Sequence, residues 1–414
     1  MANTQCLPVL VGIEFPIDQA YNKTMLIRKA YKYRLKTKPS HELKLRRAAG
    51  CSRYVWNKAL AVQKDRLDKK QPCLSYNELA GLLIEWKKDK DISFLREVHS
   101  QPQQQTLKAL HRAIHDALDR PYPKRFPSFK RKGVHDSFRY PQGFQINGDV
   151  IYRPKIGWIQ FYKSREIEGI PKNVTVSRQG AHGDIAIQVE IECEDPVHPS
   201  KEETAIDPGI TQLATLSDGT FYKPLNSFKT LESALARSQR DLSRKDKFSK
   251  NWHKQKDKVN KIHTCIAGAR SDYLHKISTT ISKNHVLIVL EDLKVANMSA
   301  RGIKEQPGRQ VTQKSGLNKA ILEQGWDEFR RMLEYKQLWR GGLVVAVPPH
   351  YTSQTCPACG HVHSDNRKTQ CHYMANADHV GARNILAAGY AVLACGEVDA
   401  VKPLDEAGIR KDAA

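Results

Sequence analysis

The sequence predicts a multi-domain α/β protein in which a helical lobe interrupts a small β-barrel or sandwich and an α/β unit comes after them. The chain has 414 residues, too long for one ordinary domain and enough for about two to four. Short alternating strands lie on both sides of a stretch with helical periodicity. A composition shift at 194–203 then precedes a strand–turn–strand, helix, strand pattern.

The first strand is expected within residues 25–39, because Ile27–Lys36 alternates apolar and basic residues. Residues 1–24 differ in character from this strand, and they lack the charged start and long apolar core of a signal peptide. We expect 1–24 to be an extension and Met25 to be the natural start.

Residues 40–130 are expected to form the helical lobe. Ser40 is the predicted N-cap of the first helix and Gly50 its predicted break. The pattern is compatible with a bundle whose basic faces are solvated, and equally with a lobe that grips a nucleic-acid duplex.

The lobe ends in a basic and aromatic segment, "RPYPKRFPSFKRKG", whose prolines exclude a helix. Aromatic faces can stack on bases while Lys and Arg meet phosphates, so the segment suits single-stranded or distorted nucleic acid. A basic loop pinned by two phenylalanines is an equally good interpretation. The candidate contacts are Lys124, Arg125, Phe126, Phe129, Lys130, Arg131 and Lys132.

Residues 138–195 contain short strands separated by Gly, Pro and Asn-Gly. Together with 25–39, the region 131–195 is expected to form the β-barrel. The stretch 194–203 then reads as a linker.

Three carboxylates in the second half of the chain are candidates for one site. Asp207 lies in an apolar strand, and Glu291 comes directly after the fully apolar strand Val286–Leu290, which is typical of a buried mixed or parallel sheet. Asp378 begins a predicted helix whose Gly381, Ala382 and Ile385 could pack closely on that sheet.

Acids from two strands and a helix are what a two-metal nuclease requires, because carboxylates suit Mg²⁺ or Mn²⁺ and two ions can activate water and stabilise a leaving oxygen. Taken singly, each acid also has an ordinary interpretation: a turn cap for Asp207, strand-end polarity for Glu291 and a helix N-cap for Asp378.

The stretch 355–386 opens like a zinc site and then departs from the pattern. Cys356 and Cys359 are two residues apart, but only Cys371 comes after them, with Lys368 three residues before it. The residues alone allow a damaged metal site, a different metal site, or a stretch whose important residue is Asp378.

The formal net charge of +23 favours polyanionic partners, with nucleic acid first and an anionic membrane surface second. No apolar run approaches the roughly 20 residues that span a bilayer. Nine irregularly placed cysteines do not resemble a disulfide framework and indicate a reducing cytosol.

With these motifs in order, the chain from Met25 to about Cys395 resembles the TnpB (OrfB) proteins of bacterial insertion sequences, relatives of the type V CRISPR nucleases. The resemblance is carried by "RKAYKYRLKT", "CSRYVWNKAL", "FPSFKRK", "AIDPGITQLATLSDG", "IVLEDLKVANM", "GWDEFRRMLEYK", "TSQTCPACGH" and "ADHVGARNIL". Several of these are long, and they occur in the family's order. Proteins of this family have long been described as transposases.

The resemblance implies an RNase H-like, RuvC-like nuclease core split along the sequence, with Asp207, Glu291 and Asp378 as its acids and Mg²⁺ (or Mn²⁺) as its cofactor. It implies a guide RNA from the transposon end, a duplex DNA target, and a monomer with RNA in the bacterial cytoplasm, associated with the nucleoid. The implied parts are a wedge-like barrel (25–39 and 131–195), a helical recognition lobe (40–130), the nuclease core (200–354), a degenerate zinc ribbon (355–372), the third RuvC-like motif (373–395) and a disordered tail (396–414).

In this family a four-cysteine ribbon precedes the third acid, and here Lys368 stands where its third cysteine is expected. Lysine is a poor Zn²⁺ ligand because it is protonated near neutral pH. The resemblance therefore leaves two alternatives. One is a Cys₃His site of Cys356, Cys359 and Cys371 with His361, His363 or His372 as the fourth ligand, of which His363 is favoured; the other is a loop without zinc.

Two further functions are weighed against an RNA-guided DNA endonuclease. One is a guided DNA-binding protein in which the incomplete ribbon impairs cleavage. The other is a DNA-binding protein with a zinc ribbon and no guide. RNA that copurifies with the protein would exclude the last, and Mg²⁺-dependent cleavage would separate the first two.

Overall fold

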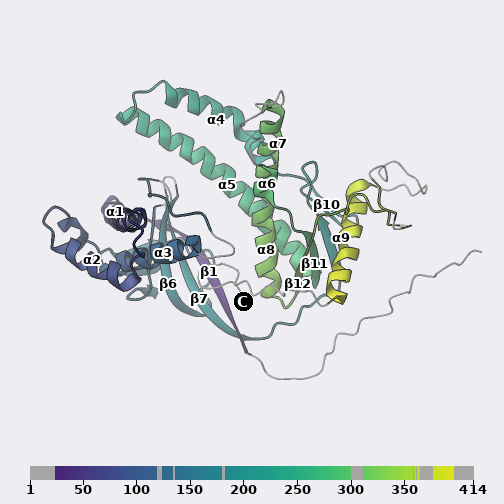
Figure 1. The fold of residues 1–414 in the computed structure, drawn as a ribbon, viewed down its shortest axis with the longest axis horizontal. Coiled ribbons are helices and arrows are strands. Elements are labelled where there is room, and N and C mark those ends of the chain that lie inside the picture. The colour runs from purple at the N-terminus through teal and green to yellow at the C-terminus, as the bar shows by residue number, and fades with distance from the viewer. Residues whose placement is uncertain are drawn as a thin grey trace, which may run out of the picture.

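Two β-sheets, one in each half of the chain, organise the protein (Figure 1). The computed structural model describes residues 24–118, 124–133, 136–179, 182–299, 311–357, 359, 361–363 and 376–395. The predicted extension, the predicted tail, Lys368 and Cys371 lie outside these residues, apart from Thr24 at the start of the first strand.

The first sheet has seven strands in the order β2-β6-β7-β1-β5-β4-β3. Strand β1 runs antiparallel to β7 along most of its length and pairs with β5 at Leu35 and Lys36. The strand predicted at Ile27–Lys36 is thus joined to strands more than a hundred residues later. The strands are β1 (Thr24–Lys36), β2 (Ser137–Tyr140), β3 (Gln145–Asn147), β4 (Val150–Arg153), β5 (Gly157–Phe161), β6 (Ile170–Gln179) and β7 (His182–Glu194).

This sheet does not close into a hydrogen-bonded barrel within the described residues, because β2 and β3 stand at the two ends of the strand order. The helical lobe packs on it instead. A first core joins Leu60 and Leu107 of the helices to Tyr140, Phe161 and other residues of the strands. The lobe consists of α1 (Pro39–Asp68), α2 (Tyr76–Lys88), the 3₁₀ turn η1 (Ser93–Arg96) and α3 (Ser100–Leu118).

Two local predictions for α1 are wrong. The helix begins at Pro39 with Lys38 as its N-cap, since proline fixes a helical φ at a position that needs no N–H donor. It also continues through Gly50, where the neighbouring Ala48, Ala49 and Cys51 are buried and packing holds the helix together. Tertiary burial outweighs the modest helix penalty of one glycine.

The second sheet has five strands in the order β10-β9-β8-β11-β12. Strands β8, β9 and β10 are antiparallel neighbours, whereas β8, β11 and β12 run parallel. The parallel arrangement predicted for the apolar strand at 286–290 is confirmed. The strands are β8 (Glu203–Asp207), β9 (Ala214–Leu216), β10 (Phe221–Tyr222), β11 (Leu287–Glu291) and β12 (Leu343–Val347).

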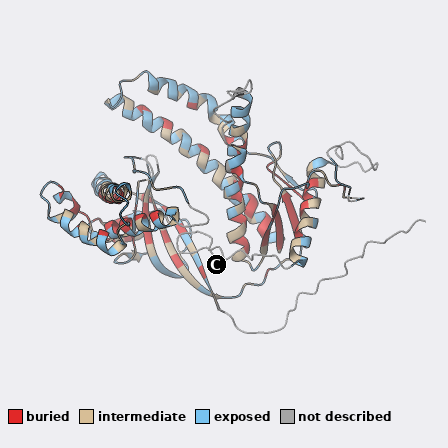
Figure 2. Cartoon of the chain, viewed as in Figure 1, coloured by how far each residue is buried: buried red, intermediate tan, exposed pale blue. Residues whose placement is uncertain are grey.

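Helices cover both faces of the second sheet (Figures 1 and 2). On one face, Ile281 of α5 and Phe329 of α8 share a core with Ile206 and Leu290. On the other, Ile385 of α9 packs against Val289 and its neighbours. The helices of this half are α4 (Ser227–Ser243), α5 (Lys250–Asn284), α6 (Val295–Met298), α7 (Val311–Gln324), α8 (Trp326–Leu338) and α9 (Ala377–Ala394).

Helices α4 and α5 form a long hairpin that projects away from the second sheet (Figure 1). Leu235 of α4 and Val259 and Ile266 of α5 make a small core of their own along it. Within the described part of the chain, no helix combines the length and apolar character that a membrane span requires.

Candidate active site

Asp207 and Glu291 lie next to each other at one edge of the second sheet. Asp207 is the last residue of β8 and Glu291 the last of β11, and these parallel strands pair with Leu290 opposite Ile206. Both carboxylates are half-buried, whereas the preceding Ile206 and Leu290 are buried. The strands therefore carry two acids from the core to the surface at their shared carboxyl edge, where ligands of such sheets commonly bind.

Helix α9, which has Asp378 in its first turn, approaches the same edge. Asn376 caps the helix by accepting a hydrogen bond from the Asp378 backbone N–H at 2.9 Å. Gly381, one turn further on, lies so close to Asp207 that an added Cβ would be 2.6 Å from Asp207 Oδ2. Residues three apart share a helix face, so the first turn of α9 lies against the Asp207 carboxylate.

Small residues allow this close approach along the length of α9. At Gly389 an added Cβ would be 2.5 Å from Val289 Cγ2 of β11, while Ala382 and Ile385 are fully buried. The predicted close packing of Gly381, Ala382 and Ile385 on a sheet is confirmed.

The donor chemistry of these acids suits a hard divalent cation, because carboxylate oxygens are the ligands that Mg²⁺ and Mn²⁺ prefer. The structure places Asp207 beside Glu291, with the turn that carries Asp378 against Asp207. It does not gather three acidic, histidine or cysteine side chains of the described residues into one ligand set.

A hydrogen-bonded loop after β12 supports Glu291. The Thr352 hydroxyl donates to Glu291 Oε1 at 2.5 Å, and Thr352 is itself buried. The Asn384 side chain of α9 donates to the carbonyl oxygens of Thr352 and Thr355 at 2.8 and 2.7 Å. Glu291, the loop and α9 are therefore held together.

Tyr351 enters this loop with φ 62°, a left-handed conformation that is uncommon for a residue with a bulky side chain. The Tyr351 carbonyl then accepts hydrogen bonds from the backbone N–H and the hydroxyl of Thr355. These contacts close the turn around Thr352.

Arg330 of α8 forms an ion pair with Asp292, the residue that follows Glu291 in the chain. Its guanidinium pairs with Asp292 at 2.5 Å and with Glu334 at 2.9 Å. Burial by itself would lower the pKa of Arg330, but the hydrogen bonds to Asp292 and Glu334 outweigh it and raise that pKa. Sequence reasoning missed Thr352, Asn384 and Arg330 as supporting residues; the only local signal was the i,i+4 spacing of Arg330 and Glu334.

The cysteine stretch begins as a small hairpin beside this loop. Thr355 and Val362 form an antiparallel bridge, and the Cys356 N–H donates to the His361 carbonyl at 2.9 Å. Cys356 is buried, whereas Cys359 and His363 are exposed. Since Cys371 lies outside the described residues, the predicted Cys₃His site stays a prediction.

The basic and aromatic segment lies along α1. Asn57 exchanges two hydrogen bonds with the backbone of Lys130, at 2.8 and 3.0 Å, and the Trp56 indole donates to the Ser128 carbonyl. Lys130 Nζ sits 3.9 Å from the centre of the Trp56 ring, and burial lowers the pKa of that lysine. The loop is thus pinned by α1 as well as by Phe126, one of its two phenylalanines.

The side chains of this segment divide into two groups. Phe126 is half-buried against the first core, and Lys124 pairs with Asp116 at 3.1 Å. Phe129 is 49% exposed, with Lys64 Nζ 4.8 Å from its ring centre. The remaining predicted contacts, Arg125, Arg131 and Lys132, are exposed.

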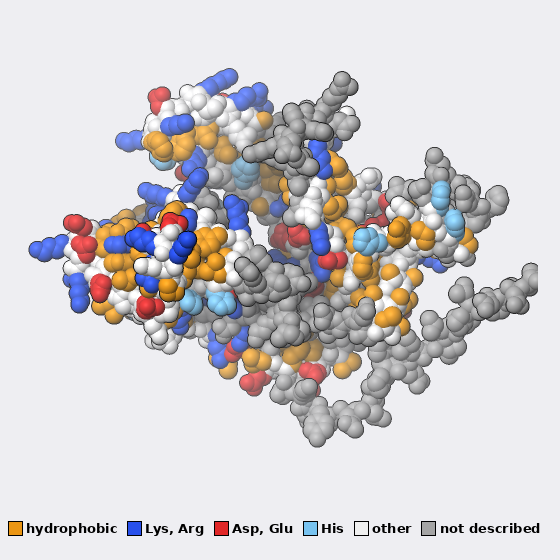
Figure 3. Space-filling model, in the orientation of Figure 1, with side chains coloured by type: hydrophobic (Ala, Val, Ile, Leu, Met, Phe, Trp, Pro, Cys, Tyr) orange, Lys and Arg blue, Asp and Glu red, His pale blue; other side chains and the backbone are white. Residues whose placement is uncertain are grey.

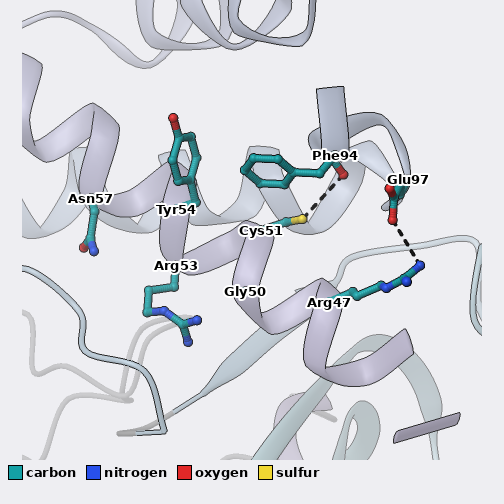
Figure 4. Close-up of a pocket in the computed structure, with 8 residues that line it drawn as sticks. All are labelled: Arg47, Gly50, Cys51, Arg53, Tyr54, Asn57, Phe94 and Glu97. Carbon is teal, nitrogen blue, oxygen red and sulfur yellow. Dashed lines mark hydrogen bonds and ion pairs between the residues drawn. The ribbon is translucent and has the colours of Figure 1, made fainter. Parts of the chain in front are cut away.

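A cavity of about 570 Å³ lies on the same helix (Figure 4). Arg47 closes one side through an ion pair with Glu97 at 3.1 Å, and the Cys51 thiol points to the Phe94 carbonyl at 3.7 Å. Burial raises the pKa of Cys51 to about 11, so its thiol stays protonated at neutral pH. The cavity is lined by Arg47, Gly50, Cys51, Arg53, Tyr54, Asn57, Phe94 and Glu97.

Comparison with known families finds three matches along the chain. A family model described as a probable transposase matches residues 186–301. A Cas12f1-like TNB domain matches 326–385, and a helix-turn-helix domain matches 25–71. The first match includes Asp207 and Glu291, and the second includes Asp378.

Two relatives cover nearly the whole chain. The Escherichia coli (strain K12) protein provisionally named RNA-guided DNA endonuclease InsQ is 50% identical over 391 residues, 91% of this chain and 96% of that protein. A Streptomyces pristinaespiralis protein, also provisionally named an RNA-guided DNA endonuclease, is 34% identical over 395 residues, 92% of this chain and 93% of that protein.

Among solved structures, one described as a Cas12f1–sgRNA–target DNA complex is similar with a TM-score of 0.48 and 13% sequence identity. It covers 87% of this chain and 98% of that chain. This likeness is too distant to assign the fold.

Proposed function

This chain belongs to the TnpB (OrfB) family of insertion-sequence proteins, and we propose that it is an RNA-guided DNA endonuclease. The observation that supports cleavage is the placement of Asp207 and Glu291 on adjacent parallel strand ends, with the turn of α9 that carries Asp378 against Asp207. The order β10-β9-β8-β11-β12, antiparallel in its first part and parallel in its second, supports an RNase H-like, RuvC-like core.

In this proposal Asp207, Glu291 and Asp378 hold Mg²⁺ or Mn²⁺. When bound, two such ions would activate water and stabilise the leaving oxygen of a phosphodiester. The chain itself supplies the positioning: Gly381 lets α9 approach Asp207, and the Thr352 hydroxyl orients the Glu291 carboxylate.

The first half of the chain would bind the nucleic acids, a guide RNA from the transposon end and a duplex DNA target. In guided nucleases of this class, base pairing reads the sequence and the protein reads the shape of the hybrid. The basic segment on α1 and the net charge of +23 support phosphate contacts without sequence reading. We propose that the protein acts as a monomer with its RNA.

Zinc would be held by Cys356, Cys359, Cys371 and His363, which are ligands of the type that structural zinc sites use. In this hairpin Cys356 directly follows Thr355, whose carbonyl accepts a hydrogen bond from Asn384. Zinc in the hairpin would therefore stabilise the loop that supports Glu291.

A guided DNA-binding protein with impaired cleavage is the second candidate. It is favoured by Lys368 at the position where the family's third cysteine is expected, because a protonated lysine cannot replace a thiolate on zinc. Binding by this protein would need RNA and would not lead to cutting.

The decisive experiment is cleavage by the reconstituted complex. Residues 25–414 would be expressed with the native flanking DNA that should supply the RNA. The purified complex would be incubated with Mg²⁺ and a guide-matched plasmid library whose flanking bases are randomised. Cutting beside one short motif is expected; an RNA-loaded protein that binds the target and never cuts would establish the second candidate, and a protein without RNA would refute both.

A further inference from the structure

The turn at the end of the α4–α5 hairpin presents an exposed aromatic side chain. Residues 244–249, here called the tip turn, join the two helices at the end that projects away from the second sheet (Figure 1). Phe248 in this turn is 77% exposed, more than any other aromatic residue among the described exposed apolar side chains. A phenylalanine so exposed at the end of a protruding hairpin contributes little to a core.

The backbone of the tip turn holds Phe248 outward. Phe248 has φ 70°, in the left-handed region that disfavours aromatic residues. Ser249 is the N-cap of α5, accepting a hydrogen bond from the Trp252 N–H at 3.1 Å, and its own N–H donates to the Asp246 carbonyl. Residues held in such conformations concentrate at ligand-binding sites.

Trp252 extends the aromatic surface behind Phe248. The two ring centres are 5.5 Å apart with the planes inclined by 50°, and Lys256 Nζ is 4.9 Å from the Trp252 ring centre. Phe248 in the tip turn, Trp252 behind it and the Lys256 ammonium group therefore lie one after another.

The hairpin around this turn is strongly basic (Figure 3). Three acids, Asp241, Asp246 and Asp257, accompany ten cationic residues, and none of the ten forms an ion pair within the described chain. Solvated charge would explain the cations alone, but it would require neither the strained turn nor the aromatic pair. The cationic residues are Arg237, Arg240, Arg244, Lys245, Lys247, Lys250, Lys254, Lys256, Lys258 and Lys261.

We propose that the tip turn is a nucleic-acid contact in which Phe248 stacks on an exposed base while the neighbouring lysines bind phosphates. A single projecting ring needs a free base face, and such a face is available at a duplex end or in unpaired nucleotides beside a duplex, not inside it. Base–aromatic stacking tolerates any base, since each has a π-face. The contact goes beyond the proposed function, because it needs neither a guide nor cleavage.

The test is binding by the full chain, without guide RNA and with EDTA present, to DNA of one sequence in three forms: a closed circle, a blunt duplex and a duplex with a single-stranded overhang. A 2-aminopurine placed at the duplex end reports stacking by loss of its fluorescence. Wild-type protein should quench this base and bind the linear forms more tightly than the circle.

Phe248→Ala should weaken binding to the linear forms by about 5- to 150-fold, the range that corresponds to the loss of one stacked base. It should restore the fluorescence and leave the affinity for the circle and the salt dependence unchanged, because phenylalanine binds no phosphate. Phe248→Trp should retain quenching. Phe221→Ala is the matched control, since Phe221 is also exposed (51%) but lies in β10.

Equal affinity of wild type and Phe248→Ala for all three forms would overturn the proposal, as would an equal loss on the circle. A preference of the overhang over the blunt end would identify unpaired nucleotides as the source of the base. Because no cutting is measured, these outcomes are independent of whether the protein is a guided endonuclease.

Discussion

At the scale of single residues, the candidate site depends on carboxylates that lie at the ends of buried strands, where the core meets the surface. Asp207 and Glu291 each end a strand whose preceding residues are buried, and both are only half-buried themselves, so neither is fully desolvated. An ionised carboxylate within the core would be far more costly. Both side chains thus stand half-buried at the carboxyl edge of the sheet, where a cation could approach them without entering the core.

Asp207→Ala should abolish Mg²⁺-dependent cutting of a guide-matched plasmid and leave RNA binding intact, because it removes a proposed metal ligand and no core packing. Plasmid cleavage and the amount of copurified RNA would be measured on the same preparation. Asp195→Ala, at an exposed residue of the linker, is the control and should cut as the wild type does. Continued cutting by Asp207→Ala would show that the site is assigned wrongly.

Thr352→Val should raise the Mg²⁺ concentration needed for half-maximal cutting by about tenfold, since hydrogen-bond partners of metal ligands typically contribute 10- to 100-fold to metal affinity or activity. Thr352→Ser should retain most of the wild-type behaviour. Thr355→Val is matched to it, because the Thr355 hydroxyl donates to the Tyr351 carbonyl and not to Glu291. Equal effects of the two valine variants would mean that the loop matters only for folding.

At the scale of elements, α9 positions the site because it packs unusually close to its sheet. Gly381 and Gly389 lie eight residues apart, and each leaves room only for a hydrogen at its contact with β8 or β11. Other helical glycines have no such contact: within 4 Å of an added Cβ at Gly268 in α5 there is nothing. The same residue type therefore has different consequences in two helices.

Gly381→Ala should lower both thermal stability and cleavage, because its Cβ would collide with Asp207 Oδ2. Gly268→Ala should instead raise the unfolding free energy by about 0.5–1 kcal/mol, the usual helical preference of alanine over glycine. Gly389→Ala should destabilise by roughly 1–3 kcal/mol through overpacking against Val289. Chemical denaturation checks all three, and wild-type stability and cutting by Gly381→Ala would contradict the close approach.

The segment on α1 allows a second comparison between matched residues. Phe129→Ala should weaken binding of single-stranded RNA by about 1–3 kcal/mol without changing stability, because Phe129 is exposed. Phe126→Ala should lower stability, because Phe126 packs against the first core. Filter binding and thermal melts separate the two effects; a binding loss confined to Phe126→Ala would favour the interpretation as a purely structural loop.

At the scale of the whole molecule, the two sheets have separate cores. The core around Leu60 and Tyr140 shares no residue with the cores around Phe329 and Val289. The halves meet through the stretch after β7 and through contacts such as Lys29 Nζ, 5.2 Å from the Trp339 ring centre. Such an arrangement permits each half to unfold without the other.

Calorimetry should accordingly show two unfolding transitions. Leu60→Ala should lower the midpoint of one by roughly 5–15 °C, and Phe329→Ala should lower the other by a similar amount, as expected for buried large-to-small changes in domains of this size. One transition that both variants shift equally would show that the halves unfold together.

The sequence by itself determined the order of the elements and the identity of the candidate residues. Apolar strands that end in acids, a helix start rich in small residues, and the basic segment are all visible as local patterns in the printed chain. The resemblance to the family's motifs added an expected role for each acid. These features are local because periodicity, chain charge and side-chain chemistry act over a few residues.

Only the tertiary structure decided what the local patterns left open. Gly50 lies within a continuous helix because its neighbours are buried. The first sheet stays open within the described residues and has helices packed on it, and Lys130 lies against Trp56. Thr352, Asn384 and Arg330 became recognisable through contacts with residues 29 to 61 positions away. Contacts between distant segments depend on packing of the whole chain, and no short window of sequence contains that information.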